Sequence, residues 1–163
     1  MSAVGVKADG VGVSLTVTPT ATVSAPGTSV GWGYSLTNNT TDYLLAVGLN
    51  AGTFNSGVLD LIDFFDYPLL APGQTVSQTF DPLNLTGLAQ FTWDADAAPG
   101  ATNSGLFSIS FDLSDPNYDD FGPSGEVAQA AYAISTTSAT VPEPASLLLL
   151  GLGLAALLLF ARR

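Results

Sequence analysis

Histidine and cysteine are both absent, so the carboxylates are the main side chains left in the chain's body for general acid or base chemistry. A Ser-His-Asp or Cys-His nucleophile is therefore impossible, and so are the usual zinc sites. Asp94 and Asp96 are spaced i, i+2, so they would share one face of a strand. A carboxylate pair is the residue set of glycoside hydrolysis. The Ala-Ala-Pro-Gly turn after Asp96 favours a solvated strand end instead, and we expect no enzymatic activity.

A second group of oxygen-bearing side chains has the spacing of a cation-binding loop. It occupies positions 1, 3, 5 and 12 of a twelve-residue segment: Asp115, Asn117, Asp119 and Glu126. Calcium takes six to eight oxygen ligands, and this spacing can wrap a loop around one ion. The match to an EF-hand loop is incomplete, because Asp120 stands where glycine makes the sharp turn. The favoured interpretation is an Asx-rich turn between strands, so no cofactor is predicted, and weak calcium binding at residues 115–126 is kept as a hypothesis to test.

The last 23 residues have a composition unlike the rest of the chain. A polar break at residues 141–146 is followed by an apolar run to Ala161 and then by Arg162 and Arg163. As a helix, residues 145–161 would reach about 25 Å at 1.5 Å per residue, against about 30 Å of bilayer hydrocarbon. Such a helix can span if the bilayer thins and the arginines snorkel. The arginines favour the cytoplasmic side, which places the body outside the cytoplasm.

This tail resembles the PEP-CTERM sorting signal of Gram-negative bacteria. The residues that carry the resemblance are Pro142, Glu143 and Pro144, the leucine-rich segment 147–160, and the terminal arginine pair. The resemblance implies an exported protein whose tail is recognised and processed near the Pro-Glu-Pro motif by exosortase, a membrane protease. It also implies an association with extracellular polysaccharide. The alternative is a simple tail anchor that follows a proline-rich joint.

The expected roles of the motif residues follow from their chemistry. Pro142 and Pro144 would hold the backbone extended and accessible to a protease, and Glu143 would be a recognition charge. The arginine pair would fix the orientation. Residues 1–10 contain one lysine and no apolar core of the length that a secretory signal peptide needs. Three explanations are open: the chain starts after its export signal, its start is misassigned, or export fails. We expect a trimmed or misassigned start.

The charge balance of the chain is strongly acidic, with a net charge of −11. All 14 acidic residues precede the apolar run, and Lys7 is the only basic residue before Arg162, so the body carries 13 net negative charges. Neutralising phosphates requires lysine and arginine, so nucleic acid is excluded as a partner of the body. Mutual repulsion should keep the body soluble and responsive to divalent cations.

The elements that must position these groups are β-strands, because apolar residues alternate with polar ones along three segments. These are residues 11–17, 30–36 and 107–113, and weaker candidates lie at 43–49, 58–64, 75–80, 88–93 and 127–134. Turn-forming pairs such as Pro26-Gly27 and Pro72-Gly73 separate them. Seven or eight short antiparallel strands predict an Ig-like β-sandwich. Its core should contain Val13, Trp32, Tyr34, Ile109 and Phe111.

The predicted organisation is one exported domain at residues 1–137, a linker with the Pro-Glu-Pro motif at 138–144, and the hydrophobic helix with its basic end at 145–163. The acidic and apolar segment 59–67 is either an edge strand guarded by charge or an exposed patch for a partner. Trp32 and Trp93 could stack on sugars, although the alternation favours a place in the core.

The functional prediction is a structural or adhesive protein of the cell surface or matrix, handled by the exosortase system and associated with exopolysaccharide or biofilm. The sequence leaves a second hypothesis open: a carbohydrate- or calcium-binding sandwich module held by a simple membrane anchor.

Overall fold

The computed structural model describes residues 12–117 and 122–138. Within these ranges the chain forms ten strands and no helix, so no helix there could span a membrane. The strands are β1 (Val13–Thr18), β2 (Ala21–Ser24), β3 (Ser29–Asn38), β4 (Tyr43–Ala51), β5 (Gly57–Asp60), β6 (Leu69–Leu70), β7 (Thr75–Gln78), β8 (Ala89–Trp93), β9 (Thr102–Ser114) and β10 (Gly122–Thr136).

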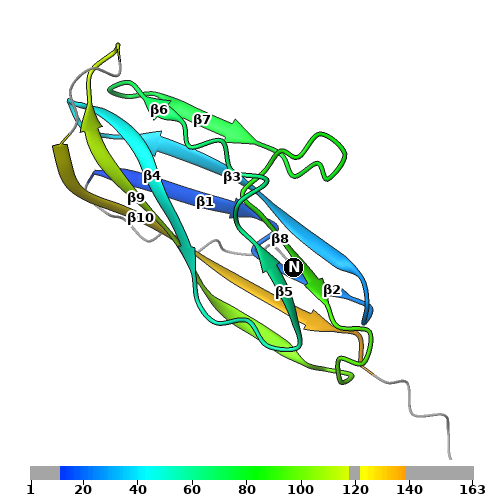
Figure 1. The fold of residues 1–163 in the computed structure, drawn as a ribbon. Coiled ribbons are helices and arrows are strands. Elements are labelled where there is room, and N and C mark those ends of the chain that lie inside the picture. Colours follow the sequence, from blue (N-terminus) through cyan, green and yellow to red (C-terminus); the bar gives the residue numbers. More distant parts are fainter. Residues whose placement is uncertain (1–11, 118–121, 139–163) are drawn as a thin grey trace, which may run out of the picture.

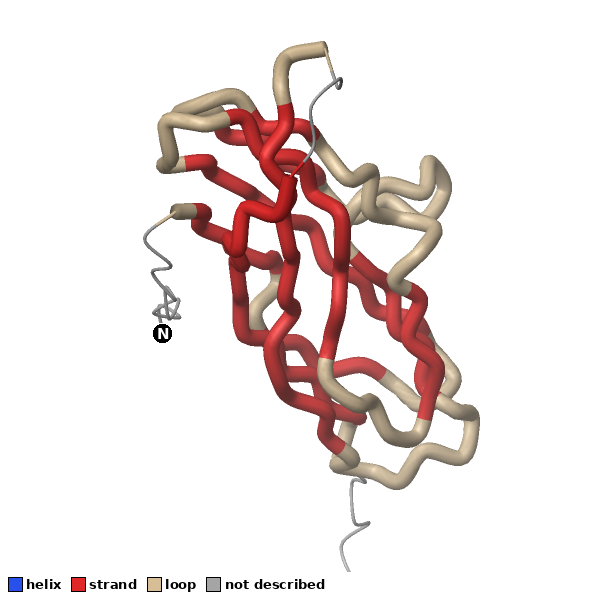
Figure 2. The backbone as a smooth tube through the Cα atoms, turned by 60° about the vertical axis from the view of Figure 1, so that its left-hand side comes forward, coloured by secondary structure: helices blue, strands red, loops and turns tan. Residues whose placement is uncertain are grey.

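The strands form two five-stranded sheets that face each other in a β-sandwich (Figures 1 and 2). The first sheet has the order β1-β3-β8-β5, with β7 also paired to β3. The second has the order β2-β10-β9-β4-β6. The predicted all-β sandwich is confirmed, but the described residues form ten strands where seven or eight were expected, because β2 and β6 are too short to show a period in the sequence. The predicted linker and hydrophobic helix begin at the edge of the described residues or lie outside them.

Strand direction departs from the prediction at one pair. β2 runs parallel to β10, with Ala21 opposite Ala133 and Ser24 opposite Thr136, whereas every other pair is antiparallel. The physical reason is a change of sheet after Pro19. β1 pairs with β3 in the first sheet, and the chain then crosses to the edge of the second sheet as β2. Sequence alternation cannot show this crossing, because β2 and β6 are too short to carry a period.

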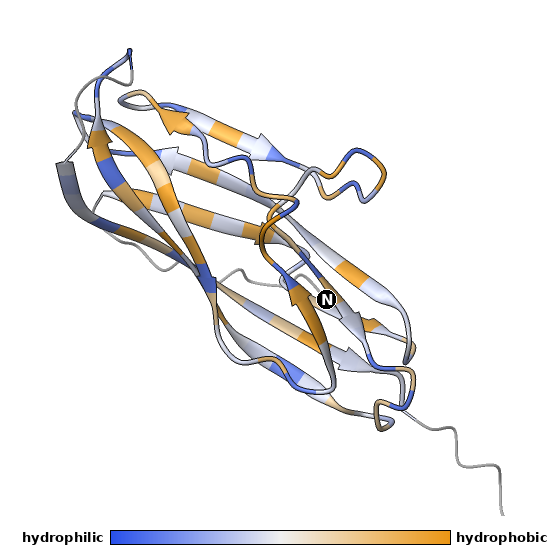
Figure 3. Cartoon of the chain, in the orientation of Figure 1, coloured by the Kyte–Doolittle hydropathy of each residue, from blue (hydrophilic) through white to orange (hydrophobic). Residues whose placement is uncertain are grey.

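The core lies between the two sheets and is built from the inward side of each alternating strand. The five residues predicted to be in the core are all at most 4% exposed: Val13, Trp32, Tyr34, Ile109 and Phe111. Figure 3 shows the alternation as bands of high and low hydropathy along the strands. On β10 the inward positions include Ala128, Ala130, Tyr132 and Ile134, which confirms a strand over an alanine-rich segment that could be mistaken for a helix.

Aromatic rings fill the centre of the core. The Trp32 ring makes edge contacts with the rings of Phe107, at 5.1 Å between centroids, and Tyr132, at 5.7 Å. The Phe54 ring stacks on Tyr132 at 4.8 Å with an interplanar angle of 9°. Offset and edge contacts of this kind add stability beyond area burial. These contacts tie β3 of one sheet to β9 and β10 of the other.

The turns agree with the residue types that predicted them. Gly27 and Gly73 follow prolines and have φ of 73° and 72°, a conformation that glycine adopts without a Cβ penalty. One predicted strand is shorter than expected: the segment 58–64 is a strand only to Asp60, whose Oδ1 then accepts hydrogen bonds from the Ile62 and Asp63 N–H groups. This carboxylate favours a turn over continued pairing.

A buried asparagine fixes the loop between β3 and β4. The Asn38 side chain is fully buried, and its Nδ2 donates to the carbonyls of Asp42 at 2.8 Å, Leu70 at 3.1 Å and Ala71 at 3.2 Å. Its Oδ1 accepts from the Thr40 N–H and hydroxyl. One side chain thereby connects the β3–β4 loop to the segment that follows β6.

Candidate functional site

The proposed sorting residues Pro142, Glu143, Pro144, Arg162 and Arg163 lie outside the described residues. The structure does define how the body ends before them. The Thr136 N–H donates to the Ala101 carbonyl at 2.9 Å, and its hydroxyl donates to the Ala98 carbonyl at 2.7 Å. The Thr137 N–H donates to the Ser24 carbonyl at 2.9 Å. The last strand is therefore held by two neighbouring segments up to Thr137.

Two of the four predicted calcium ligands share a turn. Asp115 Oδ1 accepts a hydrogen bond from the Asn117 N–H at 3.0 Å, which closes an Asx turn after β9. The Glu126 carboxylate packs over Gly12, where even a methyl group would overlap it. Asp119 lies outside the described residues. Within residues 12–117 and 122–138 no three acidic side chains are grouped to hold a metal ion, and calcium binding by the whole loop stays a prediction.

The Asp94 and Asp96 carboxylates do not occupy a strand face. β8 ends at Trp93, and both aspartates are exposed in the turn that follows. The Asp94 carbonyl accepts hydrogen bonds from the Gly27 and Ala97 N–H groups, each at 3.1 Å. The turn therefore closes the end of the sandwich. Because Asp94 and Asp96 lie in this turn, no strand holds their two carboxylates on one face, as a pair acting on one substrate bond would require.

The two tryptophans lie in the core, as the alternation favoured. Trp32 and Trp93 are both at most 2% exposed, and the Trp93 ring packs edge-on against Phe91 at 4.9 Å. Neither ring face is accessible to a sugar.

Segment 59–67 divides into an edge strand and a packed loop. β5 forms one edge of the first sheet and ends in Asp60, as expected of an edge guarded by charge. The Phe64 and Phe65 side chains turn inward and are buried, whereas Ile62 is 83% exposed. Asp66 has a structural contact, because its Oδ1 accepts a hydrogen bond from the Tyr34 hydroxyl at 2.5 Å. Burial, together with Asp66, raises the pKa of Tyr34 far above its ordinary value.

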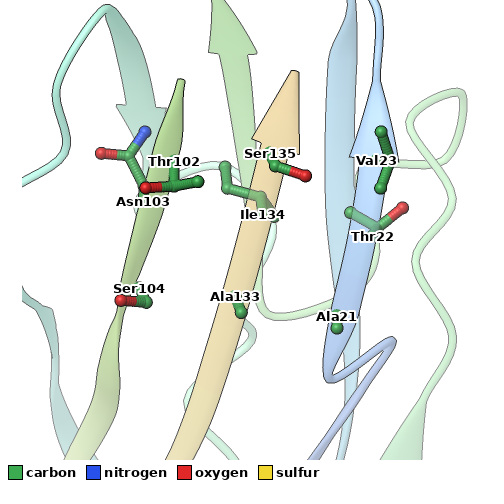
Figure 4. A pocket seen from close by; sticks show the side chains of 9 residues that line it. All are labelled: Ala21, Thr22, Val23, Thr102, Asn103, Ser104, Ala133, Ile134 and Ser135. Carbon is green, nitrogen blue, oxygen red and sulfur yellow. The ribbon is translucent and has the colours of Figure 1, made fainter. Parts of the chain in front are cut away.

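The outer side of β2, β10 and β9 is a surface that the sequence patterns did not single out. We call it the uncharged face. It is limited to β2, residues 127–135 of β10 and residues 102–110 of β9, because the outward position after these on β9 is Asp112. The outward residues within these limits alternate with the core positions and include no charged side chain: Ala21, Val23, Thr102, Ser104, Leu106, Ser108, Gln129, Ala131, Ala133 and Ser135. A shallow hollow of about 480 Å³ lies on it, and Figure 4 shows the side chains that line it.

The pairing of strands explains the shape of this face. Ala133 lies between Ala21 and Ser104, and Ser135 lies between Val23 and Thr102, so each row consists of short side chains. Val23 is 63% exposed and Leu106 is 45% exposed. The hydroxyl groups of this face can make hydrogen bonds to a neutral polymer, and its methyl groups can make van der Waals contacts with it. The sequence feature that could have predicted this face is the set of outward positions on β9 and β10. No acidic residue occurs between Thr102 and Ser110 or between Val127 and Thr136.

The family comparison places the chain's tail. Residues 140–163 match the family model of the PEP-CTERM protein-sorting motif. This chain thus carries a PEP-CTERM sorting motif after a body whose described residues form an all-β fold. The motif is an exosortase-type sorting signal of an exported protein that is sorted through the membrane, and it implies processing by exosortase, a membrane protease. Among the curated proteins none matches the chain.

Several solved structures share distant likeness with the body. The VesB protease of Vibrio cholerae has 15% identity and a TM-score of 0.42, over 76% of this chain and 32% of the protease. WR4, an MSP family member of C. elegans, has 11% identity and a TM-score of 0.37, over 77% of this chain and 97% of WR4. A family 123 glycoside hydrolase from Clostridium perfringens has 10% identity and a TM-score of 0.35, over 82% and 28%. The chain spans about a third of the length of VesB, and likeness at this level transfers no activity.

Proposed function

We propose that the protein is a non-enzymatic structural or adhesive component of the cell surface or extracellular matrix. Its body has an Ig-like arrangement of strands. The protein is exported, held transiently in the inner membrane by residues 145–161, and then released by the exosortase-type protease. The observation that carries the proposal is a sorting motif joined directly to a sandwich whose interior is filled by its own side chains. Such a body offers its outer faces rather than an internal cavity for function.

The uncharged face supports adhesion to a neutral polysaccharide. The body carries 13 net negative charges, so acidic polymers are repelled from most of its surface. The uncharged face lets a neutral chain approach without desolvating a carboxylate. Its serine, threonine and glutamine side chains can exchange water hydrogen bonds for sugar hydroxyls. Each such contact is weak, so binding would depend on many copies of the protein on one polymer.

The adhesive role is tested by cosedimentation of the full chain, in detergent micelles, with an insoluble neutral glucan and with an acidic polysaccharide gel. We expect binding to the glucan only. Ser104→Glu places a charge on the uncharged face and should abolish that binding. Thr16→Glu is the matched control, because Thr16 is an exposed strand residue of the opposite sheet. Equal binding by both variants would refute the assignment of the face.

The sorting role is tested separately, in a host that contains the processing enzyme. We expect mass spectrometry of the mature C-terminus to show loss of residues 147–163, with cleavage near Pro142–Ala145. Replacing Pro142, Glu143 and Pro144 by alanine should leave a membrane-retained precursor. Recovery of an intact tail from the unmodified chain would contradict this part of the proposal.

A further inference from the structure

The sandwich has two ends that differ in their loops. One end, here called the near end, is formed by the segments 25–28, 52–56 and 94–101, together with the last residues of β10. The other end, here called the far end, is formed by the loop 39–42, the turn 71–74 and the residues after β9. Figure 1 shows these ends at lower right and upper left.

The hydrogen bonds of Thr136 and Thr137 fix the point from which the tail leaves. They join β10 to Ala98 and Ala101 on one side and to Ser24 on the other. The tail must therefore begin at the near end, and Thr137 is the point about which the body can rotate relative to the membrane.

The distance available to the tail is short compared with the body. Eight residue steps separate Thr137 from Ala145, where the apolar run starts. A fully extended chain covers at most about 28 Å in that number of steps. β10 alone has 15 residues, so the sandwich extends about 45 Å from the near end to the far end. The near end cannot leave the neighbourhood of the membrane while the tail is intact.

Charge adds a preference for one orientation within that limit. The near end presents Asp94 and Asp96, whereas the far end and the strand ends beside it present more carboxylates: Asp42, Asp112, Asp115 and Glu126. An anionic lipid surface repels each of these within a Debye length of about 8–10 Å. A body standing on its far end would bring more of them within that layer than a body standing on its near end, so the charge distribution disfavours the far end as the membrane-facing surface.

We infer that the near end is the membrane-facing surface of the exported precursor, and that the far end, with the loop 39–42 and Asp115, is presented outward. The inference rests on the proposed membrane anchoring of the tail. It means that the processing protease must act in the gap of at most about 28 Å between the near end and the bilayer.

The absence of cysteine from the chain allows a direct test. Ala98→Cys places a single thiol at the near end, and Thr41→Cys places one at the far end; both residues are exposed. Each full-length variant is labelled with a donor dye and reconstituted in vesicles of phosphatidylcholine and phosphatidylglycerol that contain an acceptor lipid. We expect transfer from position 98 to exceed that from position 41 by roughly twofold or more, because the positions differ in height by about 45 Å.

The outcomes separate the inference from the proposal beneath it. A protein that fails to float with the vesicles has no membrane anchor, which overturns both. A protein that floats but shows equal transfer from the two positions keeps its anchor and overturns the orientation alone. High salt should narrow the difference, because screening removes the repulsion between the far-end carboxylates and the anionic lipid. Asp96→Cys and Asn39→Cys are a second pair, used if either first variant lacks the parent's β spectrum.

Discussion

Asn38 offers the sharpest test of how the loops of the sandwich are held. Its amide lies among the carbonyls of Asp42, Leu70 and Ala71, and its oxygen accepts two hydrogen bonds from Thr40. Asn38→Ala removes all of these bonds. The Leu70 carbonyl loses a buried partner, which costs about 1–3 kcal/mol, and each partly exposed group loses a net 0.5–1.5 kcal/mol. Over the one buried and four partly exposed bonds these terms add to about 3–9 kcal/mol, and because the partly exposed groups regain hydrogen bonds to water, we expect the free energy of unfolding to fall by about 3–5 kcal/mol.

That loss is a large share of a typical stability of about 5–15 kcal/mol. With a urea m value of about 2 kcal/mol/M, the unfolding midpoint should fall by about 1.5–2.5 M. The measurement is urea unfolding of the full chain in detergent micelles, followed by tryptophan fluorescence. Asn39→Ala is the matched control, because Asn39 is the exposed neighbour in the same loop, and it should change stability by less than about 0.5 kcal/mol.

A second variant at this position gives a pH dependence. Asn38→Asp keeps the oxygen that accepts from Thr40 but aims a carboxylate at three carbonyls. Burial and those carbonyls disfavour the charged form, so the folded-state pKa of the new acid should lie above its unfolded value near 3.9. The folded variant then binds more protons than the unfolded chain, and its stability relative to the parent should rise as pH falls toward 4. If Asn38→Ala unfolds within about 0.5 kcal/mol of the parent, the assigned role of the amide is wrong.

Three further predictions concern the core, a hydroxyl and the acidic loop. Trp32→Ala and Phe111→Ala should each cost about 3–5 kcal/mol, seen as a large fall in the urea midpoint; little effect of both would contradict the core assignment. Above pH 10 the free energy of unfolding of Tyr34→Phe should fall less steeply with pH than that of the parent, because the raised Tyr34 pKa makes the parent lose stability as pH rises past the unfolded value of about 10. Plots of the free energy of unfolding against pH that run parallel for the two proteins between pH 9 and 11.5 would refute this. Calcium should raise the thermal midpoint, Asp119→Ala should abolish that shift, and Asp96→Ala should leave it; an equal shift with magnesium would indicate screening alone.

The sequence by itself determined the all-β fold class of the body and the sorting motif at the C-terminus. Alternation with a period of two fixes which side chains of β1, β3 and β9 face inward, since a one-residue slip would expose them all. Glycine after Pro26 and Pro72 fixes two turns, because the required φ is costly for other residues. The sorting motif is equally readable, because its parts are contiguous and their order along the chain is the signal. These are local properties, and local sequence is sufficient to specify them.

Sequence reasoning predicted a strand over 88–93 and favoured a solvated strand end for Asp94 and Asp96, but it could not show which distant segments set that end. β8 ends where its antiparallel partners β3 and β5 begin, at Ser29 and Gly57, and that is a property of three distant segments. The same limit applies to Asn38, which reads as one half of a turn signal. Its burial depends on Leu70 and Ala71, more than 30 residues away.

Tertiary structure alone decided three features that bear on function. The parallel pairing of β2 with β10 completes the uncharged face, the bonds of Thr136 to Ala98 and Ala101 set the end from which the tail leaves, and the opposite end gathers the carboxylates. Each results from non-local contacts between segments whose separation in sequence carries no period or motif. Composition gave the body its charge, but only the packing of the sheets determined which face would be without it.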